Sequence, residues 1–273
     1  MTPDDFDRLQ PLLGSRAGFA LTRDRMQMAE HRLGPIARRE GYHNVEALLA
    51  HVWGRPLGTL GWQIIETLLN AETWFRRDRQ VFNLLSRDLL PALRTSRGNR
   101  PVRIWCAGGS SGQEAYSLAM AALETGTSVE ILSTDLSSQA LERGRAGIYT
   151  GFEIQRGLAA RTMLEWFEPL EDRWQTRQPL RDLVRFERAN LLDPLPESVG
   201  GAKPFDIIFC RYVLDDVLKD RRALILDHLC ERLSDSGCLF LGLNERLEGK
   251  AFRAVAGQSG LFVKSPERAC RAA

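Results

Sequence analysis

The stretch "RIWCAGGSSGQEAYSLAM", Arg103 to Met120, decides the fold class of this chain of 273 residues. An apolar run ends in a glycine-rich turn that starts at Gly108, and a helical pattern follows at once. In α/β proteins, a turn of this kind after the first strand holds a nucleotide-like cofactor at the N-terminus of the helix. The alternative is a tight turn in which the glycines are needed only for steric reasons. The neighbouring residues distinguish this alternative from a cofactor-binding turn.

Two acidic residues indicate the kind of cofactor. Asp135 ends the next apolar run, "ILSTD", where a carboxylate can accept both hydroxyls of a ribose. Glu114 lies in the first turn of the helix, where it would repel a pyrophosphate and attract an ammonium group. The glycine spacing also differs from G-x-G-x-x-G, and no G-K-[ST] follows. A cofactor with an adenosine ribose and a positively charged amino-acid end fits these residues, and S-adenosylmethionine has both.

The chain divides into two parts with different patterns. Residues 1–97 carry apolar side chains at helical spacing in several segments, and the polar stretch 95–101 closes this part. Beyond it, short apolar runs alternate with helical segments, which predicts an α/β fold with a mostly parallel sheet covered by helices. The last run, "FRAVAGQSGLFVK", predicts a hairpin. Residues 150–181 are too many for an ordinary connection and are expected to form a small structure of their own.

Composition and charge narrow the class of protein. The net charge of +2 and the lack of an extended basic stripe disfavour nucleic acid as a partner. No run approaches the roughly 18 apolar residues that span a bilayer, so we expect no membrane insertion. The acidic N-terminus does not resemble a secretory signal, and we expect a cytoplasmic monomer. The five scattered cysteines are expected to be reduced, most of them in the core, and no metal site is predicted because the four histidines form no ligand-spaced cluster with them.

Six motifs, in the same order, resemble the CheR-type chemoreceptor protein-glutamate O-methyltransferases. They are "ETWFRRD" (72–78), the opening stretch (103–120), "ILSTDLSSQALERGRAGIY" (131–149), "ANLLD" (189–193), "FDIIFCRYVL" (205–214) and "LFLGLNE" (239–245). The similarity covers nearly the whole chain, including "RMQMAEHRL" (25–33) in the helical part. It implies a helical N-terminal domain (1–97) for receptor docking and a Rossmann-like class I methyltransferase domain (98–273). It also implies a small inserted antiparallel β subdomain at about 150–181.

The resemblance further implies a reaction and a set of site residues. The family transfers methyl groups from S-adenosylmethionine to glutamate side chains of chemoreceptors, which forms methyl esters. The positions expected around the cofactor and the transferred methyl group are Thr73, Arg77, Gly108, Glu114, Asp135, Asn190, Leu191, Arg211 and Tyr212. Arg77 and Tyr212 are the predicted catalytic residues. For Glu114 and Asp135, the resemblance agrees with the reasoning from the residues alone.

Three positions depart from the family pattern. Ala71 and Tyr212 each stand in place of an asparagine, with Asn70 adjacent to the first, and Asp216 stands in place of an active-site tyrosine. An ionised Asp216 about 4 Å from a substrate carboxylate would cost roughly 4 kcal/mol at an effective dielectric constant of about 20. If this segment is helical, Tyr212 lies one turn before Asp216 on the same face. We therefore expect the Tyr212 phenol to replace the missing tyrosine.

Other functions and the partner surface stay open at this point. A degenerate relative could bind S-adenosylmethionine as a scaffold or sensor in a chemosensory complex, and an active one could methylate another protein or a small molecule. Arg25, Arg32 and Arg39 recur every seven residues, so they share a face if their helix continues past Gly34 and Pro35. The resemblance implies that a basic helix of this kind faces the acidic cytoplasmic domain of a chemoreceptor. A solvated face of an arginine-rich protein is the alternative.

Overall fold

The computed structural model describes residues 1–247 and 249–266, which form two compact units. The helical unit consists of Met1–Asn70 together with the later segment Leu214–Arg222. The sheet unit consists of Ala71–Val213 and the chain from Ala223 onward. Each unit has its own hydrophobic core.

The helical unit forms where the sequence carries capped amphipathic segments. Thr2 begins the first helix, since its hydroxyl accepts a hydrogen bond from the backbone N–H of Asp5 at 3.1 Å, and the Asp5 carboxylate accepts one from the backbone N–H of Thr2. Leu9, Leu33 and Ile64 are fully buried in the core that these helices share. The elements are α1 (Pro3–Ala17), η1 (Arg23–Arg25), α2 (Met26–Arg39), α3 (Val45–Val52), α4 (Thr59–Leu68) and η3 (Leu214–Asp216).

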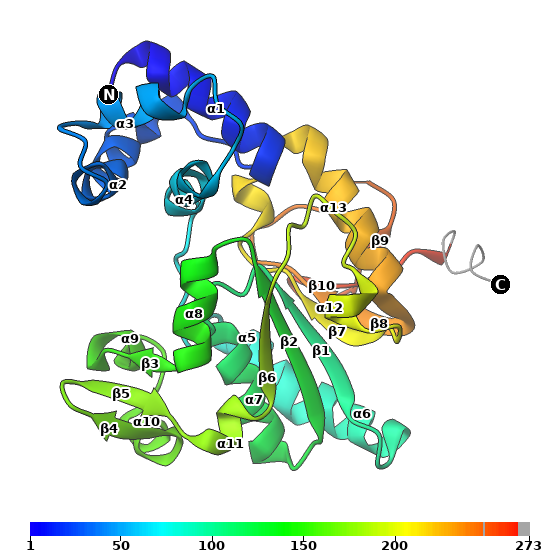
Figure 1. Cartoon of the computed structure of the whole chain (residues 1–273). Coiled ribbons are helices and arrows are strands. Elements are labelled where there is room, and N and C mark those ends of the chain that lie inside the picture. The colour runs from blue at the N-terminus through cyan, green and yellow to red at the C-terminus, as the bar shows by residue number, and fades with distance from the viewer. Residues whose placement is uncertain (248, 267–273) are drawn as a thin grey trace. The chain divides into compact units, whose positions relative to one another are not determined.

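A mainly parallel sheet organises the second unit, as the alternating pattern predicts (Figure 1). The strand order is β6-β2-β1-β7-β8-β10-β9, in which β10 runs antiparallel to both of its neighbours. The predicted C-terminal hairpin is therefore present as the last two strands. The strands are β1 (Val102–Ala107), β2 (Val129–Asp135), β6 (Val184–Arg188), β7 (Phe205–Phe209), β8 (Leu233–Phe240), β9 (Phe252–Ala254) and β10 (Leu261–Lys264).

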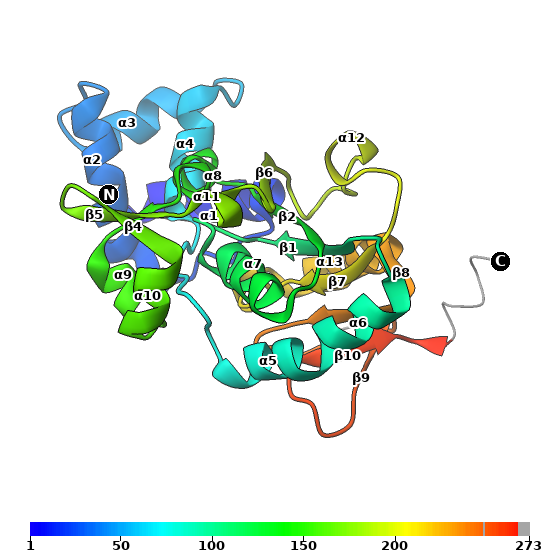
Figure 2. The same cartoon turned by 90° about the horizontal axis from the view of Figure 1, so that it is seen from below.

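Helices cover both faces of this sheet. On one face, α5 (Arg79–Leu84), η2 (Leu85–Leu89), α6 (Leu90–Arg97) and α7 (Gln113–Thr125) lie together, as Figure 2 shows. On the other face, Trp105 of β1 packs on Phe205 of β7 and borders Leu229 of α13. The other helices that follow strands of this sheet in the chain are α8 (Ser138–Ala146), α12 (Glu197–Gly200) and α13 (Lys219–Arg232).

The boundary between the units lies at Asn70, whereas the sequence patterns placed it at residue 97. The reason is packing. Phe82, Leu85 and Leu90 are at most 4% exposed and belong to the core of the sheet unit. The helical pattern of residues 79–97 is the same as that of the preceding helices, so periodicity alone does not reveal which core this segment joins.

The long connection between α8 and β6 forms the small antiparallel sheet that the sequence predicts. Its strand order is β3-β5-β4, and Figure 1 shows short helices beside it. Phe75 contacts Tyr149 and Phe167 edge to face, with ring centroids 5.1 and 5.4 Å apart, which ties this subdomain to the segment before α5. The elements are β3 (Ile148–Tyr149), α9 (Gly151–Gln155), α10 (Ala160–Trp166), β4 (Phe167–Leu170), β5 (Arg173–Thr176) and α11 (Gln178–Arg181).

Three further expectations concern the whole chain. Within residues 1–247 and 249–266, no helix combines the length and apolar character needed to cross a bilayer. The same residues contain no group of three or more histidine, cysteine or acidic side chains that could hold a metal ion. Cys106, Cys210, Cys230 and Cys238 are buried, while Cys270 lies outside the described residues.

Candidate active site

The glycine-rich turn lies at the carboxyl end of β1, where the sheet can receive a cofactor. The backbone N–H groups of Gly108 and Gly109 both donate to the carbonyl of Thr134, at 2.8 and 2.9 Å. Gly108 has a φ of +80°, and a Cβ there would lie 2.6 Å from a methyl carbon of Val213. This position therefore requires glycine both for its backbone angle and for space.

Asp135 closes the turn from the end of β2. One carboxylate oxygen accepts a hydrogen bond from the Ser110 N–H at 2.9 Å, and the other accepts from the Ser137 N–H at 2.8 Å. A carboxylate oxygen can accept more than one hydrogen bond, so these contacts orient the group and leave it able to receive hydroxyl donors. Its position fits the predicted contact with a ribose.

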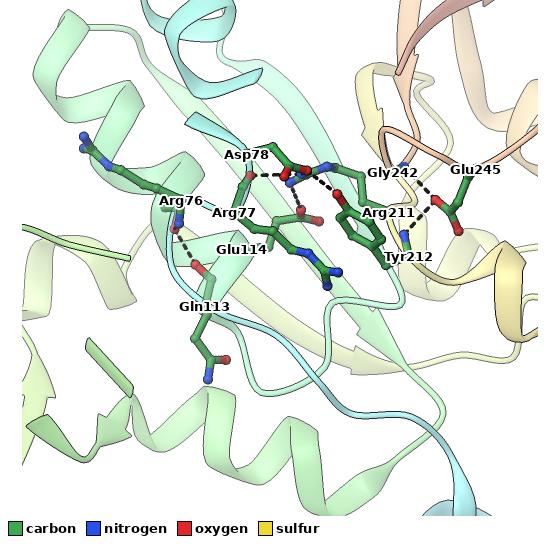
Figure 3. A network of polar contacts seen from close by, with 10 residues as sticks. Arg76, Arg77, Asp78, Gln113, Glu114, Arg211, Tyr212, Gly242 and Glu245 are labelled. Carbon is green, nitrogen blue, oxygen red and sulfur yellow. Dashed lines mark hydrogen bonds and ion pairs between the residues drawn. The ribbon is translucent and has the colours of Figure 1, made fainter. Parts of the chain in front are cut away.

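Glu114 lies in the first turn of α7 and forms an ion pair with Arg211, as Figure 3 shows. Arg211 Nη1 is 2.7 Å from a Glu114 oxygen, and Nη2 is 2.5 Å from Asp78 Oδ2 and 2.9 Å from the Arg77 carbonyl. The Arg211 side chain is only 1% exposed. One buried cation therefore connects the end of β7 to α7 and to the segment before α5.

Burial and charge act in opposite directions on this pair. Burial raises the pKa of Glu114, the charge and hydrogen bond of Arg211 lower it, and the pKa remains above its ordinary value. Burial lowers the pKa of Arg211, but the carboxylates of Glu114 and Asp78 outweigh it, so the pKa of Arg211 is raised. Arg211 thus stays charged, while Glu114 is a carboxylate that would gain from a further cationic partner.

Arg77 is set apart from the neighbouring arginine in its run by its aromatic surroundings. Its Cζ lies 3.2 Å from the ring centroid of Tyr212 and 3.9 Å from that of Trp74. Its buried Nε has no hydrogen-bond partner in the described part of the chain. The Nε of Arg76 likewise has no partner there, but the Nη2 of Arg76 is paired with Glu124. The stacked guanidinium of Arg77 therefore has a hydrogen-bond donor to offer to a carboxylate.

Tyr212 follows Arg211 in a left-handed backbone conformation, with a φ of +61°. Its hydroxyl donates to Asp78 Oδ2, and burial, together with this bond and the Asp78 charge, raises the pKa of the phenol. The condition that residues 212–216 are helical, under which Tyr212 would share a face with Asp216, is not met, because a positive φ does not fit an α-helix. Only Leu214–Asp216 form a 3₁₀ turn.

Asp216 belongs to the helical unit, where its charge is compensated. Its Oδ1 is 2.8 Å from Arg25 Nη2, and its Oδ2 accepts a hydrogen bond from Asn70 Nδ2 at 2.8 Å. The side chain is 15% exposed. The repulsion expected between Asp216 and a substrate carboxylate applies to an Asp216 charge without a partner. Because Arg25 pairs with Asp216, that charge is compensated.

The three arginines at seven-residue spacing have different roles in the helical unit. α2 continues through Pro35, but Arg25 lies before it in η1 and pairs with Asp216. Arg32 donates to the carbonyl of Leu69 at 2.8 Å. The Arg39 side chain is 59% exposed. It donates to Glu40 and to Gln63, both at 2.9 Å, so each of the three cations has a partner within the unit.

The remaining predicted residues lie in the sheet unit. Thr73 is half-buried in the irregular segment that precedes α5. Asn190 and Leu191, after β6, line a narrow pocket with Trp105 of β1, and the Leu191 carbonyl is 3.2 Å from His228 Nδ1.

Three residues of the network were not predicted as site residues. Trp74 and Asp78 lie in the motif "ETWFRRD", and Glu245 ends the motif "LFLGLNE". The sequence indicated these residues only through their place in the two motifs. Their roles could not be predicted, because their contacts join segments far apart in the chain. Two acceptor groups of the site fit S-adenosylmethionine, because Asp135 can accept hydrogen bonds from ribose hydroxyls and Glu114 can accept them from an ammonium group.

Comparison with known proteins identifies the family of this chain. The family model described as "CheR methyltransferase, SAM binding domain" matches residues 71–260, which begin where the sheet unit begins. A chemotaxis protein methyltransferase of Vibrio parahaemolyticus is 33% identical over 270 residues, which cover 95% of this chain and 95% of the relative.

Two further relatives come from Pseudomonas. The chemotaxis protein methyltransferase Cher2 of Pseudomonas putida is 30% identical and covers 90% of this chain and 91% of its own length. The probable biofilm formation methyltransferase WspC of Pseudomonas aeruginosa is also 30% identical and covers 86% of this chain and 56% of its own length. The chain therefore belongs to the CheR methyltransferase family, and its cofactor is S-adenosylmethionine.

Proposed function

We propose that this chain methylates glutamate side chains in the cytoplasmic domain of methyl-accepting chemotaxis receptors or related chemosensory receptors, forming glutamate methyl esters. The observation that carries the proposal is Arg77, a stacked guanidinium whose buried Nε has no hydrogen-bond partner in the described chain. It lies near the acidic group proposed to hold the cofactor, because its charge lowers the pKa of Glu114. A planar cation with a donor to spare suits a carboxylate substrate.

For this reaction the protein has to align the substrate carboxylate with the methyl group and exclude water from the site. A glutamate side chain has an ordinary pKa of about 4.3, so it is ionised at neutral pH and needs no general base. When bound, S-adenosylmethionine supplies a methyl group on a sulfonium sulfur, which keeps the C–S bonding electrons as the new ester bond forms at the carboxylate oxygen. Arg77 would orient the carboxylate, and Tyr212 would hold Arg77 in place through its ring.

The remaining site residues are proposed to hold the cofactor. Asp135 would receive the ribose hydroxyls, and Glu114 the ammonium group, with Arg211 keeping Glu114 in position. Asn190 and Leu191 would border the adenine, while Gly108 and Thr73 would line the approach. The assignments of Gly108, Asp135, Asn190 and Arg211 are supported by the position of these residues at or just after the carboxyl ends of parallel strands.

The helical unit is proposed to dock on the receptor. Of the three arginines at seven-residue spacing, we assign this role to Arg39, because its side chain is 59% exposed, whereas Arg25 is 34% exposed and Arg32 is part-buried. We propose that the enzyme acts in the cytoplasm, where such a receptor domain lies, and that it acts as a monomer.

The test uses the purified chain, tritiated S-adenosylmethionine and a receptor cytoplasmic fragment. We expect base-labile methyl groups on the fragment, and none on a fragment whose acceptor glutamates are replaced by glutamine. Arg77→Ala should lower kcat by about 100-fold through loss of alignment. The dissociation constant of S-adenosylhomocysteine, measured by calorimetry, should change by less than about threefold if Arg77 acts on the substrate.

Two variants sharpen this test. Arg77→Lys keeps the charge but loses the planar stack, so it should recover only part of the rate. Arg79→Ala removes an exposed arginine two positions away and should leave the rate unchanged. A chain that binds S-adenosylhomocysteine yet forms no base-labile esters would contradict the proposal and favour a scaffold or sensor. Asp216 gives that alternative no support, since Arg25 compensates its charge.

A further inference from the structure

A buried carboxylate joins the ends of two central strands beside the proposed site. Glu245 is 6% exposed, and its Oε2 accepts hydrogen bonds from the backbone N–H of Tyr212 at 2.7 Å and of Gly242 at 2.6 Å. Figure 3 shows both bonds converging on the one oxygen. Bonds from N–H groups to a charged acceptor are about twice as strong as neutral ones, so Glu245 holds the chain after β7 against the chain after β8.

This contact acts on a residue whose backbone conformation needs support. Tyr212 has a φ of +61°, a value that a bulky residue keeps only when its surroundings impose it. The Glu245 carboxylate binds the N–H of the same residue. A Cβ at Gly242 would lie 2.9 Å from two carbons of the Tyr212 ring, so the ring passes directly over this glycine. Glu245 and Gly242 together set both the backbone and the ring of Tyr212.

The Tyr212 side chain carries this placement to Arg77. Its hydroxyl donates to Asp78, and its ring centroid lies 3.2 Å from Arg77 Cζ. A chain of direct contacts therefore leads from Glu245 through Tyr212 to the guanidinium proposed to hold the substrate carboxylate.

We infer that Glu245 is a positioning residue, which fixes Tyr212 and, through it, the orientation of Arg77. The link between this orientation and methyl transfer rests on the proposed function; the orientation itself does not. Glu245 touches neither substrate nor cofactor in this account, so its removal should change the rate of transfer and leave cofactor binding nearly intact.

The first experiment observes Arg77 directly. The Nε–Hε resonance of Arg77 in protein labelled with nitrogen-15 arginine can be assigned by its absence in Arg77→Lys. Because the guanidinium stacks on an aromatic ring, we expect an upfield proton shift that is lost in Tyr212→Leu. Glu245→Ala should lose most of the same shift, and Glu245→Gln, which retains an acceptor oxygen, should restore much of it. An unchanged Arg77 resonance in Glu245→Ala would overturn the inference, whatever the enzyme methylates.

The second experiment measures transfer to the receptor fragment. Glu245→Ala should lower kcat by about tenfold or more, with the KM for S-adenosylmethionine and the affinity for S-adenosylhomocysteine within about threefold. Glu231→Ala, which removes an exposed glutamate of α13, is the matched control and should keep the full rate. A parallel loss of cofactor affinity would indicate a general structural role and would contradict the inference.

A double-mutant cycle separates action through Tyr212 from an independent effect. In the Tyr212→Ala background, Glu245→Ala should lower kcat by less than about twofold, because the route to Arg77 is already broken. If Glu245→Ala lowered kcat by the same factor in the wild-type and in the Tyr212→Ala background, the inference would be overturned. If the wild-type chain forms no ester while the Arg77 resonance responds as expected, the proposed function fails and the positioning by Glu245 stands.

Discussion

At the residue scale, the site depends on a buried cation shared by two carboxylates. Arg211 is 1% exposed and contacts Glu114 and Asp78 at 2.7 and 2.5 Å. Removing one member of such a group leaves a buried charge without compensation, which costs more than the intact arrangement contributes. This explains how Glu114, an acid whose pKa is raised by burial, can stay buried beside Arg211.

The raised pKa of Glu114 predicts a pH dependence of cofactor binding. Above that pKa the carboxylate is ionised and accepts the ammonium group; below it, a proton must leave first. Affinity for S-adenosylhomocysteine should therefore fall as pH decreases through the pKa of Glu114, by up to about tenfold per pH unit. Glu114→Gln should bind weakly and lose this dependence.

Calorimetric titrations between about pH 5 and 8 check this expectation. Glu142→Gln, an exposed position on α8, is the control and should retain the wild-type slope. Equal slopes in the wild type and in Glu114→Gln would show that another group is responsible.

At the scale of elements, the inserted subdomain reaches the proposed site by two routes. Arg156, just after α9, lies 4.1 Å from the ring centroid of Trp74 and donates to Glu72 at 2.7 Å. The same Trp74 ring lies 3.9 Å from Arg77 Cζ. In addition, the hydroxyl of Tyr149 in β3 donates to a carbonyl of the glycine-rich turn at 2.6 Å. The subdomain thus supports the site from its side of the sheet unit.

The first route predicts an effect of the subdomain on catalysis. Arg156→Ala and Trp74→Leu should each lower kcat by about threefold to tenfold, less than Arg77→Ala, because each loosens only one contact of the guanidinium. Arg173→Ala, which removes a largely exposed arginine of the same subdomain, should have no effect. Initial rates of methyl transfer measure these changes, and full activity of both Arg156→Ala and Trp74→Leu would show that the contact is only structural.

At the scale of the whole molecule, the helical unit is completed by a segment from much later in the chain. The backbone N–H of Ala20 donates to the Asp216 carbonyl, and that of Leu218 to the Gly18 carbonyl, both at 2.8 Å. Arg25 and Asn70 hold the Asp216 side chain. Leu214–Arg222 therefore belong to the helical unit although they follow β7 directly.

This arrangement predicts a local stability effect at Asp216. Asp216→Ala should lower the stability of the helical unit by about 1 kcal/mol, since Arg25 is 34% exposed and solvent weakens the pair. Faster hydrogen exchange in the α1–η1 region, followed by mass spectrometry, would report it. Asp216→Asn keeps an acceptor for Asn70 and should be intermediate. The affinity for S-adenosylhomocysteine should not change, and a large loss of it would contradict a role confined to this unit.

Much of the fold and part of the site follow from local patterns. The Thr2 cap, the central strands and the final hairpin each depend on a few neighbouring residues. Glu114 and Asp135 could be predicted because each is defined by the start of a helix or the end of a strand. Local patterns do not settle the structure of two segments. Residues 79–97 pack into the core of the sheet unit and not into that of the helical unit, and Tyr212 has a positive φ that does not fit an α-helix.

The sequence by itself therefore determined the fold class, the cofactor and the places of Glu114 and Asp135 in the fold, because these depend on the order of strands, turns and helices along the chain. Only the tertiary structure decided which groups meet. Arg211 reaches Asp78 across 133 residues, Glu245 reaches Tyr212 across 33, and Arg25 pairs with Asp216. Such contacts depend on strand order and core packing, which bring distant segments to one edge of the sheet or into one helical core and which no local pattern encodes.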